Sequence, residues 1–164
     1  MSTRRIEIVR VSVTTSKPFE AVVAALKAGV GRLDLVAFAQ ASKSPSAFTE
    51  LEEVINRDMG KTGMMLFVEF DHGAVLRKET RLDKPRIVRL VIGNPLVMKE
   101  MAKHVPDAGS YAPVTVLVDE REDGVHLSYD KMVSLLAPYR NQHALKVAQD
   151  LDHKVEKLLN EAAA

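Results

Sequence analysis

The seven residues from Met64 to Phe70 are all apolar except Glu69. A run of this kind is typical of a strand covered on both faces, because a half-exposed strand alternates apolar and polar residues. The run therefore predicts a central strand over residues 64–71. The rest of the chain must then supply a sheet around that strand and helices to cover it.

Four further segments are predicted as strands from their alternation and their β-branched residues. Ile6 to Val13 alternates apolar and polar residues, with Ile6, Ile8 and one or both of Val9 and Val11 facing inward. Asp123-Gly124 is a strong signal for a hairpin turn between two short strands. The predicted strands cover residues 6–13, 64–71, 86–92, 114–119 and 125–129.

Capping residues at three places predict where helices begin. Ser16 followed by Pro18 begins a first helix, and Thr49 with Glu52 has the spacing of a capping box. Gly93-Asn94-Pro95 marks an abrupt change from strand to helix, with Asn94 as the capping residue. Each of these helices carries an apolar stripe that can face the sheet.

Two segments leave alternatives open, and one long helix closes the chain. Residues 32–42 fit a short helix capped by Asp34 or a strand, and we favour the helix. Residues 74–84 fit a strand or a turn. Apolar residues at spacings of three and four predict a C-terminal helix over 138–160. The length of 164 residues suits one domain, so we expect a single α+β domain over residues 1–164.

Composition narrows the possible partners. The net charge is +1, which gives no sign of nucleic-acid binding, and the absence of Cys excludes disulfides and thiolate metal sites. The chain has no apolar run near the roughly 20 residues of a membrane span, and its start does not resemble a signal peptide. We therefore expect a cytoplasmic protein with no nucleic-acid or membrane partner. Phosphate-binding glycine motifs and paired histidine ligands are also missing, which predicts no cofactor and no metal.

The candidate site residues lie where strands end. Asp71-His72 follows the central strand and offers an acid and a base, although the same residues also suit a polar turn before Gly73. Asn94 begins the helix after the next predicted strand. If those two strands are parallel neighbours, both motifs share one rim of the sheet, with Tyr111 or Tyr129 nearby. The predicted ligand-binding residues are Asp71, His72, Asn94, Tyr111 and Tyr129.

The order of these motifs resembles a bacterial and archaeal family, the domain of unknown function 302. The resemblance runs from Phe67 to about Leu136 and rests on ordered motifs. These motifs are Phe70-Asp71-His72, Gly93-Asn94-Pro95, Pro113, Asp123-Gly124 and Ser128-Tyr129-Asp130. It implies a compact α+β fold, a mostly antiparallel sheet of about five strands with helices packed on it, and a homodimer. Relative to shorter family members, residues 32–62 resemble a helical insertion. The resemblance implies no established activity.

Three functional hypotheses remain from the sequence. We favour a non-catalytic domain that binds or senses a small molecule, because the methionines at 64, 65, 98 and 101 suit an adaptable apolar pocket. The same methionines also suit a plain core. The second hypothesis is a protein-interaction module that docks through the C-terminal helix. The third is a cofactor-free acid–base enzyme using Asp71 and His72, with Tyr129 or Tyr111 as proton donor.

Overall fold

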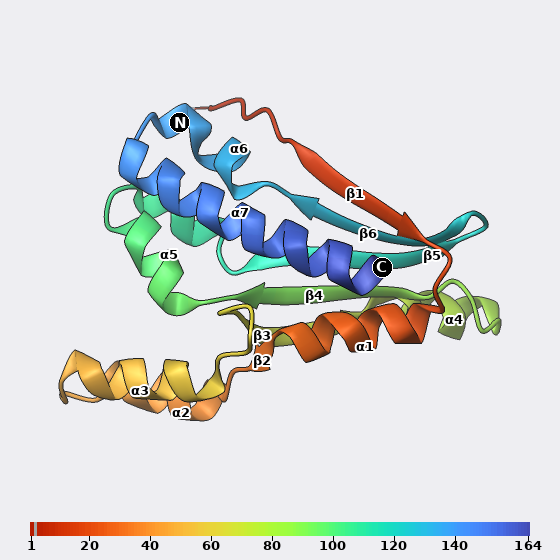
Figure 1. Ribbon diagram of the computed structural model, residues 1–164, viewed down its shortest axis with the longest axis horizontal. Helices are drawn as coiled ribbons and strands as arrows, with labels where there is room; N and C mark the ends of the chain where they lie inside the picture. The colour runs from red at the N-terminus through yellow and green to blue at the C-terminus, as the bar shows by residue number, and fades with distance from the viewer. Residues whose placement is uncertain (2) are drawn as a thin grey trace.

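The computed structural model describes residue 1 and residues 3–164, and these residues form one α+β domain built on a single sheet (Figure 1). The strands are β1 (Arg10–Thr15), β2 (Gly31–Arg32), β3 (Met65–Asp71), β4 (Ile87–Gly93), β5 (Val114–Arg121) and β6 (Gly124–Asp130). Across the described residues, the six strands lie in the order β1-β6-β5-β4-β3-β2. Every neighbouring pair is antiparallel except β2 with β3. The predicted fold class, mostly antiparallel with helices packed on the sheet, is confirmed.

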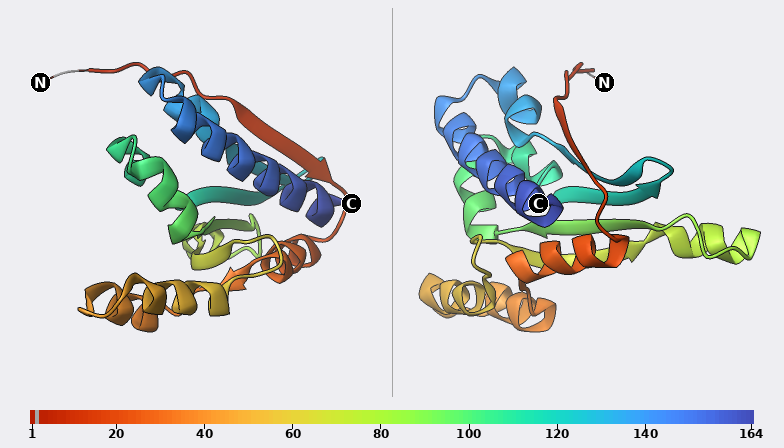
Figure 2. Two further views of the ribbon diagram at one scale, coloured as in Figure 1. Left: turned by 60° about the vertical axis from the view of Figure 1, so that its left-hand side comes forward. Right: turned by 45° about the vertical axis from the view of Figure 1, so that its right-hand side comes forward.

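The helices account for most of the remaining chain. They are α1 (Phe19–Gly29), α2 (Leu35–Lys43), α3 (Phe48–Asp58), α4 (His72–Thr80), α5 (Pro95–Ala102), α6 (Met132–Leu136) and α7 (Gln142–Ala163), with short 3-10 turns η1 (Pro106–Ser110) and η2 (Ala137–Tyr139). Helices α1, α5 and α7 lie side by side over the sheet (Figures 1 and 2). None of the helices in the described chain combines the length and apolarity that crossing a membrane requires.

The main core lies between the sheet and α7. The residues of β6 that face it are Val125, Leu127 and Tyr129, as their alternation predicts, and all three are buried. On α7 the buried stripe repeats at helical spacing and includes Ala144, Ala148, Leu151, Asp152, Val155 and Leu158. Burying apolar side chains this way contributes about 25 cal/mol for each Å² removed from water. The long C-terminal helix is therefore fixed onto its own sheet.

Helices α2 and α3 form a hairpin that projects from the sheet beside β2 and β3 (Figure 2). The two chain segments at its base meet at Gly31 and Gly60, whose amides both donate to the carbonyl of Met64, at 2.9 and 3.1 Å. A side chain at either glycine would overlap the backbone of the other segment. The hairpin has its own small core of Leu33, Ile55 and Met65.

Several local predictions need correction. Strand β1 begins at Arg10, so Ile8 and Val9 lie before it and are about half exposed, 50% and 52%. Ser16 and Thr49 are not capping residues, because α1 and α3 begin after Pro18 and Ala47 without a side-chain cap. The C-terminal helix begins at Gln142 rather than at 138.

Two ambiguous segments are resolved as helices. Asp34 accepts hydrogen bonds from the amides of Val36 and Ala37 and so caps α2, which confirms the favoured reading of residues 32–42. The sequence of residues 74–84 fits a strand or a turn, whereas in the structure α4 occupies 72–80. The polar and exposed residues of α4 give it little of the apolar periodicity that identifies a helix.

Candidate ligand-binding pocket

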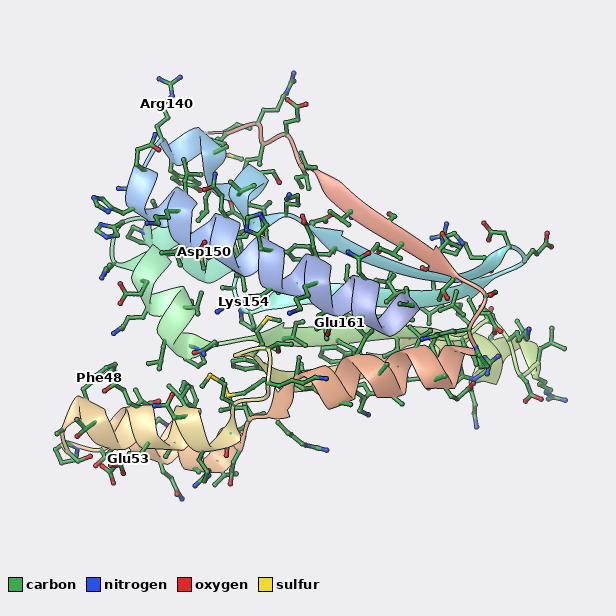
Figure 3. All side chains as sticks on the ribbon, viewed as in Figure 1. Phe48, Glu53, Arg140, Asp150, Lys154 and Glu161 are labelled. Carbon is green, nitrogen blue, oxygen red and sulfur yellow. The ribbon has the colours of Figure 1, made fainter. Side chains whose placement is uncertain are left out.

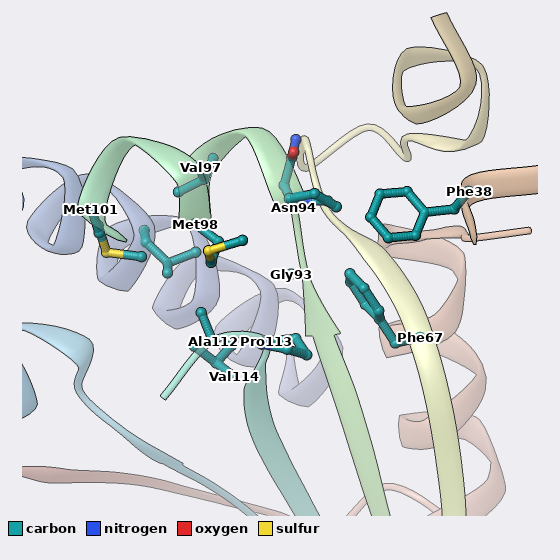
Figure 4. Close-up of a pocket in the computed structure, with 12 residues that line it drawn as sticks. Phe38, Phe67, Gly93, Asn94, Val97, Met98, Met101, Ala112, Pro113 and Val114 are labelled. Carbon is teal, nitrogen blue, oxygen red and sulfur yellow. The ribbon is translucent and has the colours of Figure 1, made fainter. Parts of the chain in front are cut away.

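A cavity of about 160 Å³ lies beneath the N-terminal half of α5, where β4 ends (Figure 4). It is bounded by the start of β5, one residue of β3, one residue of α7 and one residue of the α2–α3 hairpin. Its lining residues are Phe38, Phe67, Gly93, Asn94, Pro95, Val97, Met98, Met101, Ala112, Pro113, Val114 and Leu151. None of them has a titratable side chain. We refer to this cavity as the Met98 pocket.

The Gly93-Asn94-Pro95 motif builds the inner end of the Met98 pocket. Oδ1 of Asn94 accepts a hydrogen bond from the amide of Leu96 at 2.8 Å, which confirms Asn94 as the N-cap of α5. Nδ2 of Asn94 donates to the carbonyl of Gly63 at 2.9 Å and contacts Sδ of Met59 at 3.4 Å. The amide points toward the loop before β3 rather than into the cavity (Figure 4). Asn94 is the only polar side chain in the lining, and both its amide oxygen and its amide nitrogen are therefore hydrogen-bonded within the protein.

Two of the four predicted methionines line the pocket, and one of these, Met101, is fully buried and also belongs to the main core. Met98 and Met101 line the pocket from α5. Met64 and Met65 are almost fully buried in the main core and in the hairpin core, respectively. The unbranched, polarizable methionine side chain adapts to irregular shapes, so two flexible side chains form one wall of the pocket.

The prediction that Asp71, His72 and Asn94 share one rim of the sheet is wrong. Strands β3 and β4 are antiparallel, with Asp71 opposite Val88 and Met65 opposite Gly93. Five residue steps of β4 separate Val88 from Gly93, or about 17 Å at the usual rise of a strand. The two motifs lie at opposite ends of the sheet.

At its own end of the sheet, Asp71 stabilises helix α4. One carboxylate oxygen accepts from the amide of Ala74 at 2.9 Å and caps the helix, and the other pairs with Arg77 at 2.7 Å. The hydrogen bond from Arg77 lowers the pKa of Asp71 below its usual value. The imidazole of His72 stacks on Phe70 with the ring centres 6.0 Å apart. These contacts are those of the polar-turn alternative.

The two predicted tyrosines also lie apart from the Met98 pocket. Tyr129 is 1% exposed and its hydroxyl is bonded to Asp152 of α7. The hydroxyl of Tyr111 lies 3.4 Å from that of Tyr139. Both tyrosines border a different depression, on the face with Arg10, Arg89 and Thr115. Of the five predicted site residues, the structure places only Asn94 in the Met98 pocket.

Sequence reasoning missed the aromatic side of the pocket. Phe38 comes from α2 and Phe67 from β3, and both lie on the same side of Gly93 (Figure 4). Phe67 belongs to the apolar run that predicted the central strand, where a β-bulge between Leu66 and Val68 interrupts the pairing with β4. No local signal in the sequence distinguishes a pocket-lining Phe from a core Phe.

The sequence of the chain matches one family model, "Domain of unknown function DUF302", over residues 39–162. The chain belongs to the DUF302 family. This result confirms the family resemblance inferred from the ordered motifs. No curated protein matches the chain.

A solved DUF302 structure has the same fold. It is described as "uncharacterized conserved protein DUF302 from Bacillus stearothermophilus" and superposes with a TM-score of 0.65 at 12% identity, covering 93% of this chain and 97% of that one. At this identity the likeness concerns the fold alone. The shared fold extends over nearly the whole length of both chains.

Proposed function

We propose that this DUF302 protein binds a small apolar molecule or group in the Met98 pocket without transforming it. The observation that carries the proposal is a cavity of about 160 Å³ whose lining contains no titratable side chain. An enclosed apolar cavity of about 150 Å³ is large enough to bind benzene, and the Met98 pocket, which is partly open to solvent, has a similar volume. A six-membered ring or a short branched chain therefore matches the available volume.

The lining also favours binding over catalysis. General acid–base chemistry needs a titratable group within hydrogen-bond reach of the reacting atoms. In the Met98 pocket the sole polar side chain is Asn94, and its amide is already bonded to Leu96 and Gly63. Recognition there rests on shape and on apolar contact. Asp71 and His72, the acid and base of the enzyme hypothesis, lie at the other end of the sheet.

The interaction-module hypothesis gains no support from α7. Its apolar stripe is buried against the sheet and α1, from Ala144 to Ala162. A partner helix would have to displace that packing in order to dock through the same face. The binding proposal needs no such rearrangement.

Methyl NMR of the seven methionines tests the proposal. In protein labelled with ¹³C at the methionine methyl groups, added benzene should shift the resonances of Met98 and Met101. It should leave that of Met132, which is fully buried in the main core, in place. Val97→Phe places a ring in the pocket and should abolish the shifts. Val75→Phe, at a position 72% exposed on α4, is the matched control and should preserve them. Unchanged Met98 and Met101 resonances at saturating benzene would refute the proposal.

A further inference from the structure

Another depression, of about 340 Å³, lies between the loop before β3 and the C-terminal half of α7. Its lining residues are Lys61, Thr62, Lys154, Lys157 and Glu161. Lys154 and Glu161 both project from α7 (Figure 3). Three ammonium groups thus border one groove with a single carboxylate. We call it the lysine groove.

Most of this positive charge has no counter-ion within the protein. Glu161 lies 3.8 Å from the ammonium of Lys157 in an exposed pair, a type that contributes little. Within the described part of the chain, neither Lys61 nor Lys154 has a carboxylate within 4 Å. An ammonium group is a compact charge that binds carboxylate and phosphate groups. An anion in the groove would relieve the repulsion between the lysines.

Gly63 lies close to one residue of the Met98 pocket and to one residue of the lysine groove. The carbonyl of Gly63 accepts from Asn94 of the pocket at 2.9 Å. On its other side, a Cβ atom placed on Gly63 would lie 3.6 Å from Nζ of Lys154. Leu151, which lines the pocket, and Lys154 are one turn apart on α7. Gly63 has a positive φ of 75°, a conformation that favours glycine, and a Cβ atom on it would also lie 3.9 Å from Sδ of Met59.

From this arrangement we propose that the natural ligand is an amphipathic anion. Its apolar group occupies the Met98 pocket, and its carboxylate or phosphate binds Lys154 and Lys61 in the lysine groove. This inference rests on the proposed function, to which it adds the chemical class of the ligand. In such a ligand, a short chain joins the ring in the pocket to the anionic group in the groove, and this chain passes beside Gly63.

A pair of nearly isosteric probes separates the two proposals. The probes are 3-phenylpropionate, an anion, and 3-phenylpropan-1-ol, its neutral counterpart, each titrated against the Met98 methyl resonance. Wild-type protein should bind the anion at least 10-fold more tightly at low salt, and the advantage should fall as salt screens the charges. Lys154→Met should reduce that advantage to less than 3-fold and leave the affinity for the alcohol unchanged.

Lys146→Met is the matched control, since Lys146 is an exposed lysine of α7 that does not line the groove. It should keep the full preference for the anion. An unchanged Met132 resonance in both variants verifies that the fold is intact. Equal affinity of wild-type protein for the two probes would overturn the inference and leave the apolar-binding proposal standing. A Met98 resonance that responds to neither probe would overturn both. Competition with inorganic phosphate distinguishes the two head groups: if the site favours phosphate, millimolar phosphate should displace 3-phenylpropionate.

Discussion

The hydroxyl of Tyr129 donates a hydrogen bond of 2.6 Å to Oδ1 of Asp152, and both residues are only 1% exposed. The same carboxylate accepts from the amides of Met132 at 2.8 Å and Val133 at 3.1 Å. Asp152 of α7 therefore satisfies the first free amides of α6, which has no side-chain cap of its own. Burial raises the pKa of Asp152, although the hydrogen bonds that it accepts act in the opposite direction. Burial and the facing carboxylate of Asp152 together raise the pKa of Tyr129.

Removing the carboxylate from this network should cost more than removing the hydroxyl. Asp152→Ala leaves the Tyr129 hydroxyl without an acceptor and the part-buried Val133 amide without a partner, and the Met132 amide keeps only its 3.3 Å hydrogen bond to the Tyr129 hydroxyl. We expect a loss of about 3–5 kcal/mol in the free energy of unfolding. Tyr129→Phe removes one hydrogen bond to the carboxylate and should cost about 1.5–3 kcal/mol. Urea denaturation of both variants measures the difference. A loss below about 1 kcal/mol for Asp152→Ala would contradict the structural role assigned to the network.

The ion pair between Glu120 and Arg86 should make the free energy of unfolding depend on pH in the acidic range. Arg86 donates to the two oxygens of Glu120 at 2.6 and 2.8 Å, and these bonds, aided by Lys84, lower the pKa of Glu120 from 4.5 to about 2. Because the folded-state pKa is depressed, the stabilisation is fully present above about pH 4.5 and is lost as the pH falls toward 2.

Glu120→Gln isolates this effect. At pH 6 the variant should be less stable than the wild type by about 1.5–3 kcal/mol, the usual contribution of hydrogen bonds to a charged group. The difference should shrink as the pH is lowered from 4.5 and nearly vanish by pH 2. Urea titrations of both proteins at pH 6, 4 and 2.5 test the trend. A difference that stays constant over this range would contradict the depressed pKa.

Asn94 should act on stability through its two hydrogen bonds. Asn94→Ala loses the cap of α5 and the bond to Gly63, and should cost about 1–2 kcal/mol. Asn94→Ser keeps a side-chain oxygen that can accept from the amide of Leu96 and loses the donor to Gly63, so it should recover part of that loss. Thermal melts compare the three proteins. If Asn94→Ala melts at the wild-type temperature, the capping role is wrong.

Asp71 should matter for helix α4 and not for the Met98 pocket. Asp71→Ala removes the α4 cap and the Arg77 pair, so amide exchange in 72–80 should accelerate by a factor that corresponds to about 0.5–2 kcal/mol. Benzene binding at Met98 and Met101 should be unchanged, because Asp71 lies at the far end of β3. Hydrogen exchange and methyl NMR on the same variant provide both readouts. Loss of benzene binding would instead favour a site that links the two ends.

The sequence predicted features that a few neighbouring residues determine. Gly93-Asn94-Pro95 encodes its own turn and cap, and the stripe of α7 encodes its own buried face, so both were predictable. The relative direction of β3 and β4 depends on the chain between them, and α4 carries too little apolar periodicity to reveal that connection. For this reason the prediction of a shared rim was wrong, although Asp71 and Asn94 were correctly predicted to lie at the ends of their strands.

The candidate pocket was less predictable than the fold. Asn94 and the methionines of α5 could be found because a strand-to-helix change and an apolar stripe leave local patterns. Phe38, Phe67 and Leu151 join them only through tertiary packing. Asp152 did leave a signal that was overlooked, namely a charged residue within the apolar stripe of α7, between Ala148 and Val155.

Gly31 and Gly60 both bond to the Met64 carbonyl, so the two ends of the α2–α3 hairpin join the sheet at the same place. The hairpin leaves and rejoins the sheet at a single point, and Ile55 of α3 packs against Met65 of β3. Phe38 lines the pocket from this hairpin, whereas the other walls come mainly from α5 and the start of β5. We therefore expect substitutions in α2 to reshape the aromatic side of the pocket while the sheet and α5 keep their arrangement.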